Sequence, residues 1–329
     1  MIKIHQNNLP KGVYPVVPTP LLRNETLDLN GLRRCLDFYL SSSISGITVL
    51  GSGGELPYLT DSEQLAVVKH THDVVVETGN SKIPVIVGVN AFGVKQAINK
   101  IEQYQGMADA IMLLFNGYYQ QSFSELKQAV KAVVERSSMP VLYYHFPQVS
   151  GHFLSAKQII EILNETGVVG IKDSALHLRS AKTVLKHCPQ TAYFSGLSLL
   201  LPDLIGLGVS GAICPIGAIA PVLTAKLCKA YLIKEEQHLL AALREQLIRL
   251  LPIVSDPKNT SVKQYTLLRL AVGLPFTILK QATSPQAHTK EALRLLGIDI
   301  EPTVRQPLPS LSNSASKAIA SHLRAAQLL

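Results

Sequence analysis

A lysine stands where a buried strand is expected to end. The segment VVGIKDSA begins with β-branched residues that favour a buried strand and runs directly into Lys172 and Asp173. An ammonium group is costly to bury, so its position needs a reason. Burial favours the neutral amine, and a neutral amine can attack a ketone to form a Schiff base, which then acts as an electron sink. A salt bridge from Lys172 to a carboxylate on a neighbouring strand would explain the position equally well.

Two tyrosine pairs also follow predicted strands. The segment MPVLYYHFPQVSG contains Tyr143 and Tyr144, and GYYQQSF contains Tyr118 and Tyr119. Side chains alternate along a strand, so only one of Tyr143 and Tyr144 can face the inside of a barrel. A phenol at a strand end can transfer protons, or it can pack with its hydroxyl hydrogen-bonded. The pattern leaves both interpretations open.

A glycine-rich turn follows another predicted strand. In ITVLGSGGELPYLT, Gly51, Ser52, Gly53 and Gly54 come directly after the β-branched run. Consecutive small residues let backbone N–H groups approach an anion closely, so the turn could hold a carboxylate. Glycine turns are common, and this one alone does not define a site.

Eight short apolar runs alternate with helical patterns over the first 216 residues. The predicted strands are 12–17, 47–51, 83–90, 110–115, 139–145, 168–172, 192–196 and 211–216. Strands that alternate with single helices predict right-handed βαβ units and a parallel sheet. Eight units fit a (β/α)8 TIM barrel, in which the C-terminal ends of the strands carry the chemistry. A doubly wound open sheet is the alternative.

The pattern changes after residue 216. Later segments have apolar residues at helical spacing and no strand pattern. We therefore predict an α/β fold with a (β/α)8 barrel over 10–219 and a C-terminal helical domain over 220–300. Residues 301–329 are predicted to be a Pro/Ser-rich linker and a short tail helix.

Composition argues against several classes of protein. The net charge is +8, but the basic residues are dispersed and tryptophan is absent, which favours a solvated basic surface over nucleic-acid binding. Apolar runs stay short of the ~18 residues that a membrane span needs. The first residues, MIKIHQNNLPKG, lack the apolar region of a signal peptide, so a cytoplasmic location is expected.

Cofactor and metal motifs are weak. The four cysteines are scattered without metal-binding spacing and are expected to be reduced thiols. His70 and His72 are two residues apart and do not share a helical face. GLGVSG (206–211) matches GxGxxG, but it follows an apparent helix and precedes a strand, the reverse of a dinucleotide site. We expect neither a cofactor nor a metal.

Three motifs in one order resemble those of a known family. GSGGE (51–55), YHFPQVSG (144–151) and GIKDS (170–174) are similar to motifs of the dihydrodipicolinate synthase / N-acetylneuraminate lyase family of class I aldolases. The resemblance covers roughly residues 10–300. It implies a (β/α)8 barrel followed by a C-terminal helical domain, and a homo-oligomer, either a tetramer or a dimer.

The resemblance also implies roles for particular residues. Lys172 matches the Schiff-base lysine and Tyr144 the tyrosine that shuttles protons. Ser52 matches a hydroxyl that relays protons with that tyrosine, and the N–H groups of Ser52 and Gly53 would hold the substrate carboxylate.

Further residues follow from the same resemblance. Gly51 and Ile213 are implied as substrate-binding residues. A tyrosine after the fourth strand would come from a neighbouring subunit. Tyr118 is the first choice for it and Tyr119 the alternative.

The implied reaction joins or separates a 2-oxo acid and an aldehyde. Lys172 would condense with pyruvate or a longer 2-oxo acid without any cofactor, and the enamine would add to, or be released from, the aldehyde. The activity would be similar to that of N-acetylneuraminate lyase or of a 2-keto-3-deoxy sugar acid aldolase.

Four departures from the family pattern leave the second substrate undetermined. Val149 stands where the synthases carry an arginine for an acidic substrate, and Gly53 stands where a threonine is usual. His145 replaces the usual asparagine, and Leu197 offers no polar group for a polyol. Dihydrodipicolinate synthase, a sugar-acid dehydratase and a non-catalytic 2-oxo acid binding protein are the alternatives.

Overall fold

The computed structural model describes residues 9–119, 121–232, 237–274 and 285–329. Eight parallel strands are hydrogen-bonded in the order β1-β8-β7-β6-β5-β4-β3-β2. The strands are β1 (Gly12–Val13), β2 (Ile47–Val49), β3 (Val85–Ala91), β4 (Ala110–Phe115), β5 (Val141–His145), β6 (Gly170–Asp173), β7 (Ala192–Ser195) and β8 (Gly211–Ala212).

The sheet closes between the segment after β1 and strand β2. The N–H of Val17 donates to the carbonyl of Thr48 over 2.8 Å, and the N–H of Thr48 donates to the carbonyl of Pro15 over 2.9 Å. These bonds join the two ends of the strand order, so the predicted (β/α)8 barrel is confirmed. Strands β1 and β8 are shorter than predicted: Pro15 lacks the N–H that a regular ladder needs, and the segment after β8 turns into a helix that begins at Pro215.

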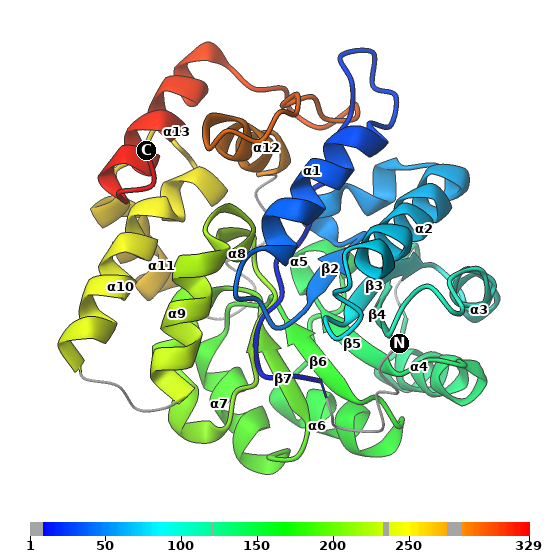
Figure 1. Ribbon diagram of the computed structural model, residues 1–329. Helices are drawn as coiled ribbons and strands as arrows, with labels where there is room; N and C mark the ends of the chain where they lie inside the picture. Colours follow the sequence, from blue (N-terminus) through cyan, green and yellow to red (C-terminus); the bar gives the residue numbers. More distant parts are fainter. Residues whose placement is uncertain (1–8, 120, 233–236, 275–284) are drawn as a thin grey trace.

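Helices follow the strands and cover the outside of the barrel (Figure 1). They are α1 (Leu29–Leu40), α2 (Asp61–Glu77), α3 (Val94–Gln103), α4 (Phe123–Arg136), the short α5 (Pro147–Ser150), α6 (Ala156–Glu165) and α7 (Leu178–His187). Capping boxes begin α2, α4 and α6, where a Ser or Thr side chain bonds the N3 backbone and the N3 Glu or Gln reaches back. After β7 the apparent helix is instead two 3-10 turns, η3 (Ser198–Asp203) and η4 (Ile205–Leu207), because Pro202 cannot donate an α-helical bond.

Further helices gather beside the barrel, coloured from yellow-green to red in Figure 1. They are α8 (Pro215–Ile219), α9 (Pro221–Leu232), α10 (Gln237–Leu250), the 3-10 turn η5 (Leu251–Val254), α11 (Ser261–Ala271), α12 (Gln286–Leu295) and the tail helix α13 (Asn313–Ala325). Helix α9 packs against β1, and α13 packs against α10 and α12. The predicted divisions after residues 219 and 300 stay predictions.

Strand alternation divides the buried side chains into two layers. One cluster, which includes Tyr144, Phe194 and Ile213, fills the inside of the barrel. The other, which includes Tyr143 and Tyr193, lies between the strands and the helices. Of the helices in the described ranges, none is long and apolar enough to cross a membrane.

Candidate active site

Lys172 lies near the C-terminal end of β6 with its side chain among those that line a cavity. The residue is only 4% exposed. Its Nζ lies 4.1 Å from the centroid of the Tyr144 ring, which places the amine over the aromatic face. No ion pair with Lys172 occurs within the described part of the chain. The geometry therefore does not support the salt-bridge explanation of this lysine.

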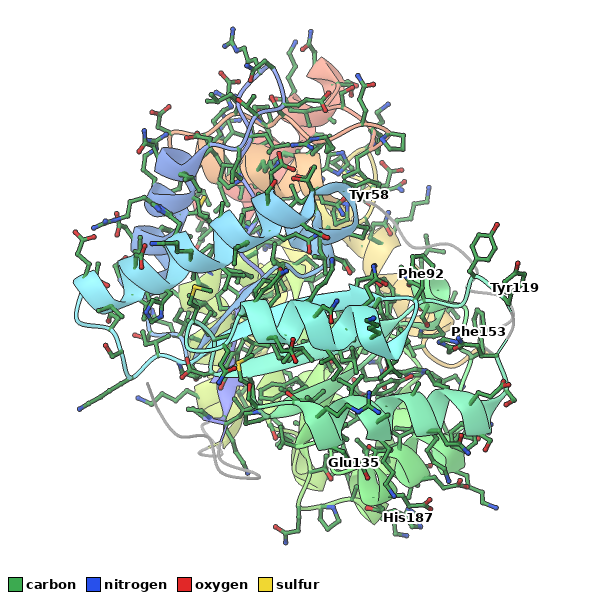
Figure 2. The ribbon with its side chains drawn as sticks, turned by 90° about the vertical axis from the view of Figure 1, so that its right-hand side faces the viewer. Tyr58, Phe92, Tyr119, Glu135, Phe153 and His187 are labelled. Carbon is green, nitrogen blue, oxygen red and sulfur yellow. The ribbon has the colours of Figure 1, made fainter. Side chains whose placement is uncertain are left out.

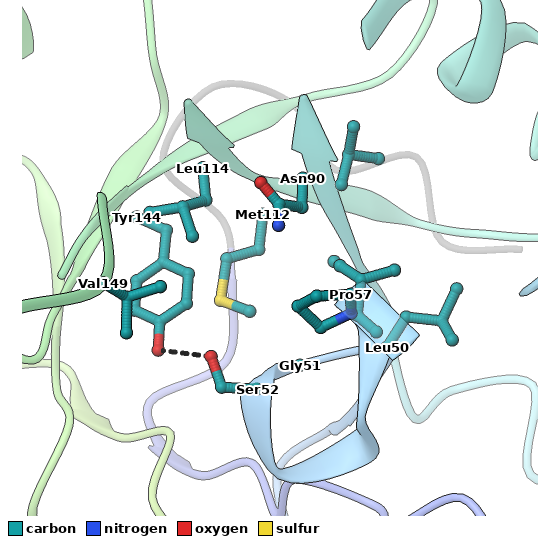
Figure 3. Close-up of a pocket in the computed structure, with 12 residues that line it drawn as sticks. Leu50, Gly51, Ser52, Pro57, Asn90, Met112, Leu114, Tyr144 and Val149 are labelled. Atoms are coloured by element: carbon teal, nitrogen blue, oxygen red, sulfur yellow. Dashed lines mark hydrogen bonds between the residues drawn. The ribbon is translucent and has the colours of Figure 1, made fainter. Parts of the chain in front are cut away.

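The phenol of Tyr144 lies between the lysine and the glycine-rich turn. Tyr144 pairs with Lys172 in the β5–β6 register, and both side chains line the cavity. The Tyr144 hydroxyl lies 3.3 Å from Ser52 Oγ, within hydrogen-bond distance (Figure 3). Tyr143 belongs to the outer layer and stacks on His145. The predicted alternation thus selects Tyr144 as the inward residue.

The turn that carries Ser52 is a 3-10 turn, η1 (Ser52–Gly54), with Gly51 preceding it. A Cβ built on Gly53 would lie 3.2 Å from Val16 Cγ1, so a threonine at this position would require Val16 to shift. Gln286 of α12 donates its side-chain amide to the carbonyl of Ser52 over 2.9 Å. No local sequence pattern signals this contact, because it joins segments far apart in the chain.

The residue that closes the turn belongs to a buried charge pair. Glu55 has a left-handed backbone (φ 60°) and forms an ion pair with Lys290 of α12, and both side chains are fully buried. Lys290 also donates to the carbonyl of Thr303 over 2.5 Å, and the N–H of Arg305 donates to Glu55 over 2.9 Å. Helix α12 and the segment after it therefore hold the turn that carries Ser52.

A second cluster of polar side chains lies on the outer face of the strands. His145 Nδ1 lies 3.0 Å from Asp173 Oδ1, and the Tyr193 hydroxyl donates to Asp173 Oδ2 over 2.5 Å. Burial alone would raise the pKa of Asp173, but the contacts with His145, Tyr193 and the N–H of Ala175 lower it below its usual range. Asp173 is therefore bound to β5 and β7 rather than to Lys172.

The cavity at the C-terminal ends of the strands has a volume of about 380 Å³. Ser52, Gly53, Tyr144 and Lys172 line it together. Ile213 is fully buried inside the barrel and is not among the described residues that line this cavity. Its predicted role in substrate binding stays a prediction.

A smaller void adjoins the contact between Tyr144 and Ser52. It has a volume of about 20 Å³ and is lined by Gly51, Ser52, Tyr144 and Val149, among others (Figure 3). In a family synthase, the arginine at the position of Val149 would serve an acidic substrate; here the side chain is apolar and half-exposed.

The tyrosine pair after β4, Tyr118 and Tyr119, lies outside the cavity of Lys172. Tyr118 and Tyr119 are each 79% exposed, and their ring centroids are 5.0 Å apart. Tyr119 and Phe153 lie at one edge of the molecule (Figure 2) and line a separate cavity of about 460 Å³. Neither tyrosine lines the cavity of Lys172 within the same chain.

Metal ligands do not converge in the described ranges. Across 9–119, 121–232, 237–274 and 285–329, no three His, Cys, Asp or Glu side chains are placed to hold a metal ion. Cys35, Cys188, Cys214 and Cys228 are all buried as free thiols.

The site brings an amine, a phenol and a hydroxyl to the C-terminal ends of barrel strands, where enzymes of this fold carry their reactive groups. These are the parts that a Schiff-base-forming barrel enzyme needs. Comparison with known proteins also indicates an enzyme of this kind. Residues 9–275 match the model of the dihydrodipicolinate synthetase family, and the chain belongs to that family. It is an enzyme of the lyase class.

Relatives within the family carry different activities. A 4-hydroxy-tetrahydrodipicolinate synthase of Dechloromonas aromatica (strain RCB) is 27% identical over 87% of this chain and 98% of its own length. A probable 2-dehydro-3-deoxy-D-pentonate aldolase, YjhH of Escherichia coli (strain K12), is 26% identical over 80% of this chain and 88% of its own. The solved structure of YagE from E. coli K12, in complex with pyruvate, has a TM-score of 0.80 at 24% identity and covers 97% of this chain and 99% of that chain.

Proposed function

We propose that the protein is a class I aldolase that forms a Schiff base between Lys172 and pyruvate or another 2-oxo acid. The observation that carries the proposal is the cluster of three groups in one cavity. Lys172 Nζ lies 4.1 Å from the centre of the Tyr144 ring, and the Tyr144 hydroxyl lies 3.3 Å from Ser52 Oγ. The N–H groups of the turn with Ser52 and Gly53 would bind the carboxylate of the 2-oxo acid.

The proposed reaction needs only these groups, the two substrates and water. The Lys172 amine adds to the ketone carbon, and loss of water gives the imine. A proton leaves C3 of the bound acid, and the resulting enamine attacks the aldehyde carbon. The aldehyde oxygen takes a proton, and water then hydrolyses the imine and frees Lys172. Tyr144 carries the protons, and Ser52 relays them to it.

Two further assignments belong to this proposal. Tyr118 is proposed to complete the proton relay from a neighbouring copy of the chain, which makes the working protein a homo-oligomer. The high exposure of Tyr118 and its absence from its own chain's cavity lining support that assignment. Among the described lining residues Lys172 is the only charged one, which speaks against the acidic second substrate of a synthase.

Borohydride trapping tests the proposal directly. The protein is incubated with pyruvate and borohydride, and intact mass and peptide mapping locate the adduct. We expect one pyruvyl group on Lys172. If neither pyruvate nor longer 2-oxo acids are trapped, the aldolase proposal fails and a non-catalytic 2-oxo acid binding protein replaces it.

A further inference from the structure

The cavity of Lys172 has two chemically different walls. Strand ends and the turn after β2 supply Ser52, Tyr144 and Lys172. Much of the remaining wall is aliphatic and comes from the segments after β6 and β7, from η5 and from α11. Its leucine and valine side chains are Leu176, Leu197, Leu251, Val254, Leu267 and Leu268.

Several polar side chains on this wall already have partners in the protein. Ser255 donates its hydroxyl to the carbonyl of Leu251 over 2.8 Å, and Gln286 donates to the carbonyl of Ser52 over 2.9 Å. Gln148 reaches the carbonyl of Ala175 at 3.4 Å. These three donors are engaged with main-chain carbonyls, so a substrate hydroxyl could accept a hydrogen bond from them only by displacing an existing bond.

Charge excludes a second class of substrate. Lys172 is the one charged side chain among the described residues of the lining, and the Schiff base consumes its amine. A carboxylate or phosphate on the second substrate would enter a largely apolar space in which the described lining offers no second cation, which is unfavourable.

The size of the cavity leaves room for a sizeable second substrate. About 380 Å³ lies within the ~300–1,000 Å³ typical of pockets that bury whole small ligands. Beyond the space that a three-carbon 2-oxo acid would fill, the cavity is bordered mainly by apolar side chains. Burying the apolar surface of a substrate against them is favourable.

We propose that the second substrate is an apolar aldehyde, and that the product is a 4-hydroxy-2-oxo acid with an aliphatic or aryl group on C4. This inference rests on the proposed aldolase function. The enamine pair at C3 forms the new bond to the aldehyde carbon, and the C=O π pair moves to the oxygen, which takes a proton. Hydrolysis of the imine with one water releases the product, and cleavage is the reverse.

The test uses pyruvate with three aldehydes: propanal, hexanal and glyceraldehyde. Propanal and glyceraldehyde share a three-carbon skeleton and differ by two hydroxyl groups. We expect kcat/KM for propanal to exceed that for glyceraldehyde by about 10–100-fold. Hexanal should exceed propanal, by up to about fourfold for each added methylene that becomes buried. A higher kcat/KM for glyceraldehyde than for propanal would overturn the inference.

Two leucines on one helix provide a matched pair of variants. Leu267 and Leu270 of α11 are both exposed, at 48% and 62%, but only Leu267 is one of the cavity-lining side chains. Leu267→Gln should lower the ratio of kcat/KM for hexanal over propanal severalfold, whereas Leu270→Gln should leave that ratio unchanged. Equal ratios in both variants would contradict an apolar wall at this position.

Trapping with pyruvate separates this inference from the proposed function. An adduct on Lys172 combined with a preference for glyceraldehyde would refute the apolar second substrate and leave the aldolase intact. Failure to trap any 2-oxo acid would refute the aldolase itself.

Discussion

Two of the buried lysines, Lys172 and Lys290, differ in what their amines contact. Lys290 is fully buried, pairs with Glu55 and donates to the carbonyl of Thr303. Lys172 is nearly as buried, but its amine lies over the Tyr144 ring at a cavity. The two lysines are therefore buried to a similar degree, but their amines contact different partners.

The difference separates a structural lysine from a reactive one. Burial lowers the pKa of Lys290, and the charge of Glu55 opposes that effect and favours the ammonium form. The amine of Lys290 is occupied, and it helps to hold the turn after β2. An amine beside a cavity, with no ion-pair partner in the described residues, is accessible to a ketone.

Replacing Lys172 should have the largest effect. Lys172→Met should abolish the borohydride adduct and all turnover, because no other amine lines the described cavity. Its free energy of unfolding should stay the same or rise, since no ion pair is broken and a buried amine is removed. Mass spectrometry and urea unfolding measure the two effects.

Lys182→Met on the surface of α7 is the control, and it should keep the adduct. Turnover that survives in Lys172→Met would show that the lysine has been assigned wrongly.

Removing the phenol oxygen of Tyr144 should have the next largest effect. Tyr144→Phe keeps the ring beneath the amine but loses the hydroxyl that contacts Ser52. We expect kcat to fall about 10²–10⁴-fold while the 2-oxo acid still binds. Tyr143→Phe is the control on the outer face of the same strand, and it should change kcat far less. Equal losses in both variants would assign the proton transfer elsewhere.

Breaking the structural pair should affect stability more than chemistry. Lys290→Met leaves Glu55 buried without its cation, which should cost about 3–5 kcal/mol of unfolding free energy in urea. The double variant Glu55→Gln, Lys290→Met removes both charges and should recover most of the loss. If Lys290→Met were as stable as the unchanged protein, the ion pair would not stabilise the fold, and Lys290 would not be a structural lysine.

These contrasts also show what sequence can predict. Strand patterns and the spacing of motifs were sufficient to predict the barrel, because each βα unit is a local pattern that the closed sheet repeats. The joint role of Lys172 and Tyr144 was implied only by the resemblance to the family; in the structure the two residues are partners in the β5–β6 register.

Contacts between distant segments were not predictable in this way. The pair of Glu55 and Lys290 joins the turn after β2 to α12, and no local pattern in either segment signals the other. Gln286 reaches Ser52 for the same reason. The tail also illustrates this limit: no local pattern signals that Arg305 binds Glu55 and Glu63.

The smallest expected effect concerns the carboxylate next to Lys172. Contacts with His145 and Tyr193 lower the pKa of Asp173 below its ordinary value of 3.8 despite burial. A carboxyl group with a depressed pKa stabilises the fold above its unfolded pKa, and that stability is lost as the pH falls through the lower, folded value. Asp173 should therefore add to the acid limb of the stability curve below about pH 4, by at most ~1.4 kcal/mol per pH unit.

Comparing the unchanged protein with Asp173→Asn in urea at several acid pH values isolates this contribution. The variant should lose that part of the slope, and it should still trap pyruvate on Lys172, because Asp173 is bound to the opposite face of the strands. An unchanged slope would mean that His145 and Tyr193 do not stabilise the carboxylate. Loss of trapping in a folded variant would instead make Asp173 the counterion of Lys172, and the contrast between the two lysines would disappear.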